Sequence, residues 1–269
     1  MVSRKAVIGA GIALAAFGGG VAVAGRGVEV EGGGSGKTAS LSCPGGMSRL
    51  GHVFGPGGSV FEGDPLTEIE IVATIDADGY LVEKLTTGVH NGTHLDVPAH
   101  FIPDGRSIDE LQAQEFVWPA YVIDVRQRMA ATEDDSFQLT VDDIRAVERR
   151  QGRIPKGAMV IIQTGFDQFY GTEAYDAPAP GFSGDAVQWM VDQRRIGGVG
   201  SDTYGPDATS DVDFAATYTI LANDRVAMPD IANVDSLNRN GDIIIASAVP
   251  LVDGSAFMVD PLACHARGR

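Results

Sequence analysis

Three of the five histidines in this 269-residue chain lie in one short stretch that begins at His90 and ends at His100. The stretch reads His-Asn-Gly-Thr-His-Leu-Asp-Val-Pro-Ala-His, and its histidines and its aspartate all occupy even-numbered positions. In an extended chain, alternate side chains point to the same face. The side chains that can gather on one face are therefore His90, His94, Asp96 and His100.

Two residues indicate that this stretch is not a regular strand throughout. Gly92 permits a tight or left-handed backbone, and Pro98 lacks the N–H that a central strand needs. We expect a strand that ends near His90, followed by a bent loop. Neutral imidazoles and a carboxylate are ligands of divalent ions such as Zn²⁺, and three protein ligands leave a coordination position for water or substrate. A single histidine is more often a core or surface residue, but the constellation indicates a metal site.

The stretch from His90 to Phe101 matches every fixed position of H-x-G-T-H-x-D-x-P-x-H-F. This signature resembles that of the metal-dependent cyclase family, which includes bacterial kynurenine formamidase and isatin hydrolase. The resemblance implies an α/β protein with a swivelling β/β/α fold, a homodimer, and hydrolysis of an amide or lactone by metal-activated water. It also implies that His90, His94 and Asp96 bind the metal, Zn or Mn, and that His100 transfers the proton.

The chain departs from family members that hold two metals, which supply a further histidine and, twelve residues later, a glutamate. An ungapped register places Thr217 and Pro229 at these positions, and proline cannot ligate a metal. Asp230 could substitute after a shift of one residue, although an aspartate beside a proline is more often a turn residue. We therefore expect one metal ion, and a degenerate, catalytically silent site remains the alternative.

The N-terminal region has the layout of a secretory signal. Arg4 and Lys5 precede an apolar stretch of small residues, and a cleavage site follows at Ala24. An uncleaved membrane anchor is the alternative, which the Gly- and Ala-rich composition disfavours. We expect residues 1–24 to be a signal peptide, residues 25–38 a flexible Gly-rich tether, and residues 39–269 a single domain. The mature protein is then secreted, periplasmic or held in the cell envelope.

Charge and cysteine content restrict the possible partners. The formal net charge of −16 makes nucleic acid an improbable partner and disfavours anionic membranes. The two cysteines, Cys43 and Cys264, lie near the ends of the mature domain, and in an exported protein this placement favours a disulfide. Zinc binding by these two residues alone is less plausible. A small molecule is the expected ligand.

Several secondary-structure elements are readable in the sequence. Residues 68–75 and 80–90 predict a hairpin around the turn signal 76–79, and residues 121–125 and 158–163 predict strands buried on both faces. Thr140 begins a capping box, so a helix is expected up to Gly152. A second helix is expected over 183–195, a strand crossing at 197–200, and the last strands over 242–249 and 256–259.

Two irregular stretches, residues 170–180 and 202–213, are expected to border the metal site, since long loops in a compact domain tend to do so. Phe61 and Phe166 are candidate aromatic walls for substrate, with ordinary core packing as an equal alternative. His52 is a candidate contact of the pocket. His265 lies in a basic tail and is expected to be solvent-exposed.

These observations predict a metal-dependent hydrolase of a small cyclic or aryl amide, imide or lactone. A metal lowers the pKa of bound water towards neutrality, and an imidazole such as that of His100 suits proton transfer near neutral pH. Export disfavours a cytoplasmic substrate such as that of kynurenine formamidase. The alternatives are a non-catalytic envelope protein that binds a metal or ligand, and a polyketide-type cyclase.

Overall fold

Residues 43–266 are described in the computed structural model. The expected signal peptide and tether lie outside this part of the chain. Within it, no helix is both long enough and apolar enough to span a bilayer.

The two apolar runs that the sequence predicts as buried strands lie side by side at the centre of one sheet. They are β5 (Val117–Asp124) and β7 (Met159–Gln163), which pair in parallel with Tyr121 opposite Val160. Their side chains alternate between two apolar cores, which is why both strands are apolar up to their last residues, Asp124 and Gln163. Parallel pairing continues outward from β7 to β9 (Gly198–Ser201) and β10 (Val226–Met228).

The complete sheet has nine strands in the order β1-β13-β11-β5-β7-β9-β10-β4-β12. The strands beyond the parallel centre pair antiparallel, and β10 pairs with β4 in the same way. These outer strands are β1 (Met47–Arg49), β4 (His94–Asp96), β11 (Asn240–Ile245), β12 (Ala256–Met258) and β13 (Leu262–Cys264). A separate parallel pair joins β6 (Gln138–Leu139) to β8 (Gly181–Phe182).

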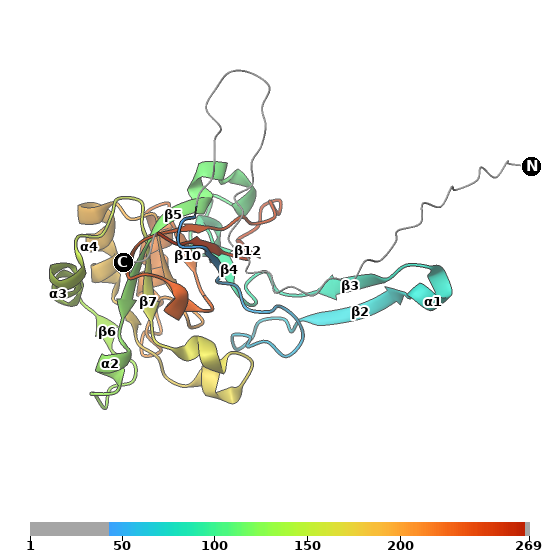
Figure 1. The fold of residues 1–269 in the computed structure, drawn as a ribbon, viewed down its shortest axis with the longest axis horizontal. Coiled ribbons are helices and arrows are strands. Elements are labelled where there is room, and N and C mark those ends of the chain that lie inside the picture. Colours follow the sequence, from blue (N-terminus) through green and yellow to red (C-terminus); the bar gives the residue numbers. More distant parts are fainter. Residues whose placement is uncertain (1–42, 267–269) are drawn as a thin grey trace, which may run out of the picture. The chain divides into compact units, whose positions relative to one another are not determined.

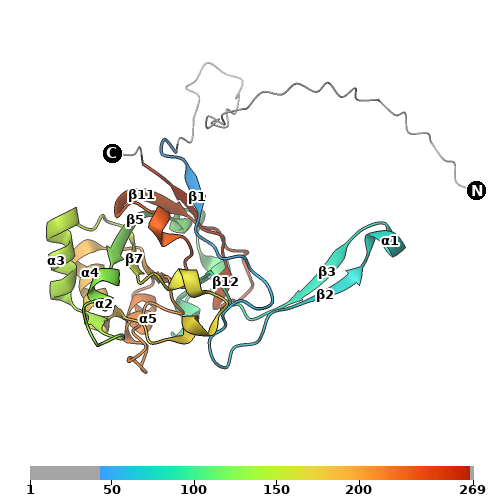
Figure 2. The ribbon, with the colours of Figure 1, turned by 60° about the horizontal axis from the view of Figure 1, so that its bottom comes forward.

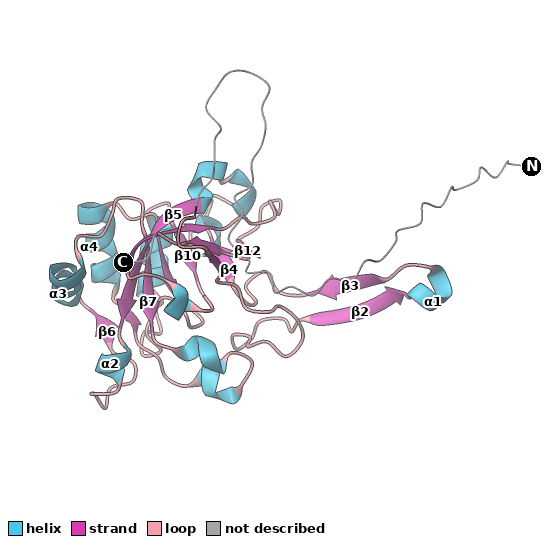
Figure 3. Ribbon diagram, viewed as in Figure 1, coloured by secondary structure: helices cyan, strands magenta, loops and turns pink. Residues whose placement is uncertain are grey.

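Three helices pack on one face of the sheet (Figure 3). The predicted capping box is confirmed, because Thr140 and Asp143 exchange hydrogen bonds at the start of α3 (Val141–Gln151). The second predicted helix is also confirmed as α4 (Gly184–Arg194), and α5 (Ala215–Ala222) lies against it. Val160 and Ile162 contribute to the core beneath these helices, whereas Met159 and Ile161 contribute to the core on the other side.

The remaining helices are single turns. Two are α-helical, α1 (Ile75–Asp78) and α2 (Arg126–Met129). The 3₁₀ turns are η1 (Pro98–His100), η2 (Ile108–Glu110), η3 (Ala113–Phe116), η4 (Phe166–Phe169), η5 (Glu173–Asp176) and η6 (Val234–Ser236).

The predicted hairpin is confirmed as β2 (Glu68–Ala73) and β3 (Val82–Thr86), with α1 at its tip. Figures 1 and 2 show that this hairpin extends away from the nine-stranded sheet. One detail of the prediction is wrong: the strand expected to reach His90 ends at Thr86, before the turn that leads to the metal motif.

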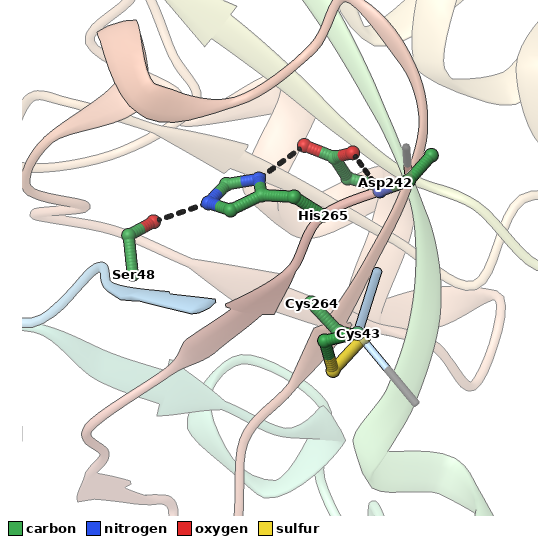
Figure 4. The surroundings of a disulfide bond; sticks show 6 residues. Cys43, Ser48, Asp242, Cys264 and His265 are labelled. Atoms are coloured by element: carbon green, nitrogen blue, oxygen red, sulfur yellow. Dashed lines mark hydrogen bonds and ion pairs between the residues drawn. A yellow bond between two sulfur atoms is a disulfide. The ribbon is translucent and has the colours of Figure 1, made fainter. Parts of the chain in front are cut away.

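The predicted disulfide between Cys43 and Cys264 is confirmed, with the two Cα atoms 5.1 Å apart (Figure 4). It joins the start of the described chain to its last strand. The expectation that His265 is solvent-exposed is wrong, because the imidazole is largely buried between Asp242 and Ser48. Asp242 is fully buried in the sheet and provides the acceptor that holds the ring there.

Candidate metal centre and active site

The stretch from His90 to His100 consists of three consecutive parts: a turn at Gly92, a short strand and a 3₁₀ turn. Gly92 takes a left-handed backbone with φ of 65°, and a Cβ there would come within 2.9 Å of the Phe54 ring. The next residues form β4 between β10 and β12, so the motif contains a short strand rather than only a bent loop. Pro98 then begins η1, which ends at His100. The alternation in β4 places His94 and Asp96 on one face.

The carboxylate of Asp96 is the centre of the cluster. Its Oδ1 atom lies 2.9 Å from Nδ1 of His90 and 3.1 Å from Nε2 of His94. Ligand atoms of His90, Asp96 and His100 lie within 4.8 Å of one another. In the described part of the chain, this is the one group of three or more such residues with that spacing. Nitrogen and carboxylate oxygen atoms therefore converge on one small volume, which fits a divalent transition metal.

Neighbouring groups orient the rings. Nδ1 of His94 donates to the Gly92 carbonyl at 2.7 Å, which leaves Nε2 as the ring atom that faces Asp96. Nε2 of His90 lies 3.0 Å from the Ser255 hydroxyl. The ring of His100 stacks on that of His90, with 3.9 Å between centroids, and is the most exposed of the three imidazoles.

Burial and charge set the protonation of these groups. Burial alone would raise the pKa of the Asp96 carboxyl, but the neighbouring histidines lower it well below its usual range. Burial alone would likewise lower the pKa of His94, but the negative charge of Asp96 dominates and raises it to about 9. Partial desolvation lowers the pKa of His100, so this imidazole is neutral at pH 7. A metal ion would compete with a proton for His94, whereas His100 is ready to accept one.

A cavity of about 1070 Å³ opens directly over the cluster. Aromatic rings form much of its wall: Phe61 lies edge-to-face with Tyr204 at 5.8 Å and with Phe214 at 6.2 Å, and Phe101 meets Phe214 at 6.0 Å. Both irregular stretches that the sequence places near the metal line this cavity, which confirms that expectation. The cavity has the size and apolar lining of a small-molecule site.

The structure does not bring Phe166 and His52 into this cavity. Phe166 is buried against Tyr175 and lines a different cleft, of about 790 Å³. His52 lines the same cleft and stacks on Tyr170, with 3.9 Å between ring centroids. Phe166 was expected at the substrate wall because of its loop position, yet its apolar ring is better satisfied in the small core beneath the loop.

Of the residues at or beside the second-metal positions, Thr217 and Asp230 line the cavity and Pro229 does not, and they form no second ligand cluster within the described residues. The Thr217 hydroxyl donates to Asp207, whose carboxylate also accepts the backbone N–H groups of Ala216 and Thr217 at the start of α5. Asp230 is buried and accepts a 2.6 Å hydrogen bond from Tyr175. Burial raises the pKa of Asp230 to about 7.

Sequence reasoning missed Asp207, Tyr175 and Tyr204 as residues of the site. Tyr175 and Tyr204 fall in the two irregular stretches that were expected near the metal, so their aromatic character was an available signal. Asp230 was weighed as a turn residue, and its backbone does have a left-handed φ of 53°. Only the fold shows that this turn directs its carboxylate into the cavity.

Fold and comparisons together indicate a hydrolase of the cyclase family. The Cyclase family model, described as "Putative cyclase", matches residues 48–208, and the chain belongs to this family. An isatin hydrolase from Roseibium aggregatum is 31% identical over 217 residues, which cover 74% of this chain and 81% of that protein. A kynurenine formamidase from Bacillus cereus is 43% identical over 60 residues, or 22% of this chain and 29% of that protein.

Solved structures support the fold. The crystal structure of an isatin hydrolase bound to the product analogue thioisatinate matches with a TM-score of 0.75 at 29% identity, over 81% of this chain and 91% of that one. The mixed α/β architecture with a curled sheet is that of the cyclase family, so the predicted fold class is confirmed. The resemblance found in the His90–Phe101 stretch is confirmed as family membership.

Proposed function

We propose that this protein hydrolyses a small cyclic or aryl amide, with isatin-like lactams as the first substrates to test. The observation that carries the proposal is the convergence of His90, Asp96 and His100 beneath a cavity walled by aromatic rings. Similarity to isatin hydrolase over most of the chain supports the lactam class, and the match to kynurenine formamidase supports an acyclic aryl amide as the second choice.

One divalent ion, Zn²⁺ or Mn²⁺, is proposed to be held by His90, His94 and Asp96. When bound, such an ion supplies Lewis acidity and makes hydroxide available near neutral pH. The described residues favour one ion over two, because the carboxylate of Asp207 is already satisfied by the start of α5. Asp230 is engaged by Tyr175, so a second ion there would have to displace that hydrogen bond.

His100 is proposed to move the proton. Its imidazole is neutral at pH 7, lies at the edge of the cluster and faces the cavity, so it can accept a proton from the attacking water. The same nitrogen can then return that proton to the departing amide nitrogen. Asp96, held as a carboxylate by its neighbours, would stabilise the imidazolium while the proton resides on His100.

The wall of the cavity is proposed to select a flat ring. The edge-to-face contacts of Phe61 leave its ring partly exposed at the cavity mouth, 45% of its surface being accessible. An aromatic substrate could pack against Phe61 and Phe214 while its amide carbonyl reaches the cluster. Phe214 keeps a left-handed φ of 52° at the start of α5, and strained backbone of this kind tends to occur at functional sites.

The experiment combines metal analysis with a substrate screen. We expect about one Zn²⁺ or Mn²⁺ per chain, and hydrolysis of isatin or of an N-formyl arylamine followed by ring absorbance. His100→Asn should lower kcat by about 10²- to 10⁴-fold while metal content stays unchanged. Phe61→Ala should raise KM, whereas the control Phe169→Ala, a partly exposed phenylalanine in the other cleft, should not.

Each part of the proposal can fail separately. A purified protein that takes up no metal would overturn the hydrolase mechanism. A metal-loaded protein that binds ring amides without turnover would instead indicate a non-catalytic binding protein. Turnover that is insensitive to His100→Asn would exclude the proton-transfer role while leaving the metal site intact.

We also propose that the mature protein works outside the cytoplasm. The signal-like N-terminal sequence and the Cys43–Cys264 disulfide both support export, since disulfides persist in oxidising compartments. The mass of the protein recovered from the extracellular or periplasmic fraction should correspond to a chain that begins at Gly25. A full-length chain found only in the cytoplasm would overturn this proposal.

A further inference from the structure

The ring of His90 is held at both of its nitrogens. Nδ1 lies 2.9 Å from Oδ1 of Asp96, and Nε2 lies 3.0 Å from Oγ of Ser255. The ring also stacks on that of His100, with 3.9 Å between centroids. Rotation of the His90 ring by half a turn would put carbon atoms in place of both nitrogens and would lose both hydrogen bonds. The two bonds therefore fix which nitrogen faces the carboxylate at the centre of the cluster.

Ser255 is itself firmly placed beside the metal motif. It directly precedes β12, in which Ala256 pairs with Asp96. Its backbone carbonyl accepts the N–H of Val97 at 3.1 Å. The serine is thus bonded to the motif twice, through its backbone and through its hydroxyl, although 165 positions of sequence separate it from His90. Ser255 does not line the metal cavity, so it acts on the site only through the ring that it touches.

The Ser255 hydroxyl suits both neutral forms of the imidazole. A carboxylate only accepts hydrogen bonds, so the contact with Asp96 places a proton on Nδ1 of His90, and Nε2 then accepts from the hydroxyl. For Nδ1 to bind an ion, that proton has to leave, because a metal ligand must offer a lone pair. The ring stays neutral if the proton is carried on Nε2 instead and donated to the same hydroxyl oxygen. A carbonyl in this place would fit only the second form.

We propose that Ser255 is a positioning residue of the metal centre, and that its hydroxyl directs Nδ1 of His90 towards the ion by holding Nε2. The inference rests on the metal-binding role of His90 in the proposed function. His94 has the opposite arrangement, since its Nδ1 donates to the Gly92 carbonyl and its Nε2 faces Asp96. The two histidines would therefore bind through different ring nitrogens, each with its other nitrogen held by an oxygen atom.

A matched contact elsewhere in the molecule provides the control. Oγ of Ser48 lies 2.9 Å from Nε2 of His265, and Nδ1 of that ring lies 2.8 Å from Asp242. This second arrangement of serine, histidine and aspartate has nearly the same distances as the first. Its residues line neither of the two cavities and belong to no part of the metal motif. Ser48→Ala therefore removes the same kind of hydrogen bond without affecting His90.

The first experiment measures metal affinity in the absence of substrate. The mature protein and its variants are titrated with Zn²⁺ and with Mn²⁺ against a competing chelator. Ser255→Ala should raise the Kd of the metal about 10- to 100-fold, the usual cost of losing a hydrogen bond to a ligating histidine. Ser255→Thr keeps a hydroxyl and should stay within about threefold of wild type. Ser48→Ala should bind the metal as wild type does.

The outcomes decide the role of Ser255 independently of catalysis. A metal Kd for Ser255→Ala within about twofold of wild type would overturn the proposal. Equal losses of affinity in Ser255→Ala and in either Ser255→Thr or Ser48→Ala would also overturn it. Thermal unfolding of each variant before metal is added serves as the folding check. The expected pattern of affinities in a protein that hydrolyses no amide would contradict the proposed reaction and leave the role of Ser255 standing.

A second experiment observes the ring nitrogens directly. Long-range proton–nitrogen correlation spectra of protein with isotope-labelled histidine distinguish a protonated ring nitrogen from one bound to zinc, and His90→Gln identifies the His90 signals. Zinc-loaded wild type should carry a proton on Nε2 of His90 and zinc on Nδ1, and Ser48→Ala should give the same His90 signals. A proton on Nδ1 of His90 in the zinc-loaded protein would overturn the proposal.

Discussion

Two pairs of histidine and aspartate in this molecule have almost the same geometry and different surroundings. His90 lies 2.9 Å from Asp96 in the metal motif, and His265 lies 2.8 Å from Asp242 near the disulfide (Figure 4). In the first pair, two further histidines, His94 and His100, lie close to the same carboxylate, and a cavity opens above them. In the second pair, neither of the two cavities described above reaches the ring, whose nitrogens bond to Asp242 and Ser48.

The difference lies in how far each carboxylate is saturated with hydrogen bonds, since both nitrogens of His90 are also engaged, by Asp96 and Ser255. The Asp242 carboxylate accepts two hydrogen bonds from Asn238 and one from the backbone of Ala266, in addition to that from His265. The other nitrogen of His265 faces the Ser48 hydroxyl at 2.9 Å. No ligand atom is left for a metal or a substrate. The pair of His90 and Asp96 can act chemically because its carboxylate is less saturated and lines a cavity, whereas the pair of His265 and Asp242 stabilises the fold.

The largest expected effect is a difference in hydrolytic activity between variants of Asp96 and Asp242. Asp96→Asn should lower kcat/KM by about 1,000-fold or more, since it removes a metal ligand and the charge that holds the cluster together. Asp242→Asn should leave kcat/KM within about twofold at 25 °C, because nothing that it contacts reaches the cavity. Steady-state hydrolysis with metal analysis measures both.

An equal loss of activity in Asp96→Asn and Asp242→Asn would contradict the distinction between the two histidine–aspartate pairs. Equal loss with full metal content in both would mean that the disulfide end of the sheet is coupled to the cavity. Thermal unfolding of both variants controls for simple loss of the folded state.

The next largest effect concerns the disulfide between Cys43 and Cys264, which lies near His265. Replacing Cys43 and Cys264 by serine should lower the free energy of unfolding by up to about 4–5 kcal/mol, the chain-entropy value for a very long closed loop. Activity at 25 °C should persist, because the bridge joins β13 to Cys43, the first of the described residues, and not to the metal loop. Denaturant titration of the oxidised wild type and the double variant gives the difference. A change below 1 kcal/mol would contradict this reading.

The features of the fold and of the site that the sequence predicts are those that depend on residues close together in the chain. The His90–Phe101 motif, the capping box at Thr140 and the two buried strands depend on nearby residues, and the sequence predicts each of them. The disulfide was predictable because only one pairing of two cysteines exists. The family resemblance supplied the fold class, which periodicity alone would have left as an unspecified α/β sheet.

Features that depend on long-range packing were not predictable. Phe166 follows Gly165 and Phe61 lies two residues before Gly63, yet only Phe61 lines the metal cavity, since tertiary packing decides which ring is buried. His265 appeared exposed because its neighbours in the sequence are basic, whereas its acceptor Asp242 lies 23 residues away in another strand. The turn at Asp230 could be predicted from its proline, but not the direction in which its carboxylate points.

A smaller effect is expected in the pH dependence of stability. Burial alone would raise the pKa of Asp242, but the hydrogen bonds from Asn238, His265 and Ala266 lower it. A lowered folded-state pKa adds stability above the unfolded value of about 3.9, and this stability is lost as the pH falls through the folded-state value. Asp242→Asn should therefore cost about 2–3 kcal/mol at pH 6–7. The difference from wild type should shrink below pH 4, as thermal unfolding across pH 3–7 would show. A constant difference would contradict the assignment.

The smallest effect tests whether the second pair is a concealed hydrolytic site. Ser48, His265 and Asp242 have the order of contacts of a serine nucleophile, its base and its orienting carboxylate. The Ser48 hydroxyl, however, is also bonded to the Ser236 hydroxyl at 2.8 Å, and Ser48 lines neither of the two cavities described above. Ser48→Ala should cost about 1 kcal/mol of stability, leave hydrolysis unchanged, and make no difference to fluorophosphonate labelling. Labelling of Ser48 in the wild type would show that saturation does not separate the two pairs, and the comparison would fail at its central premise.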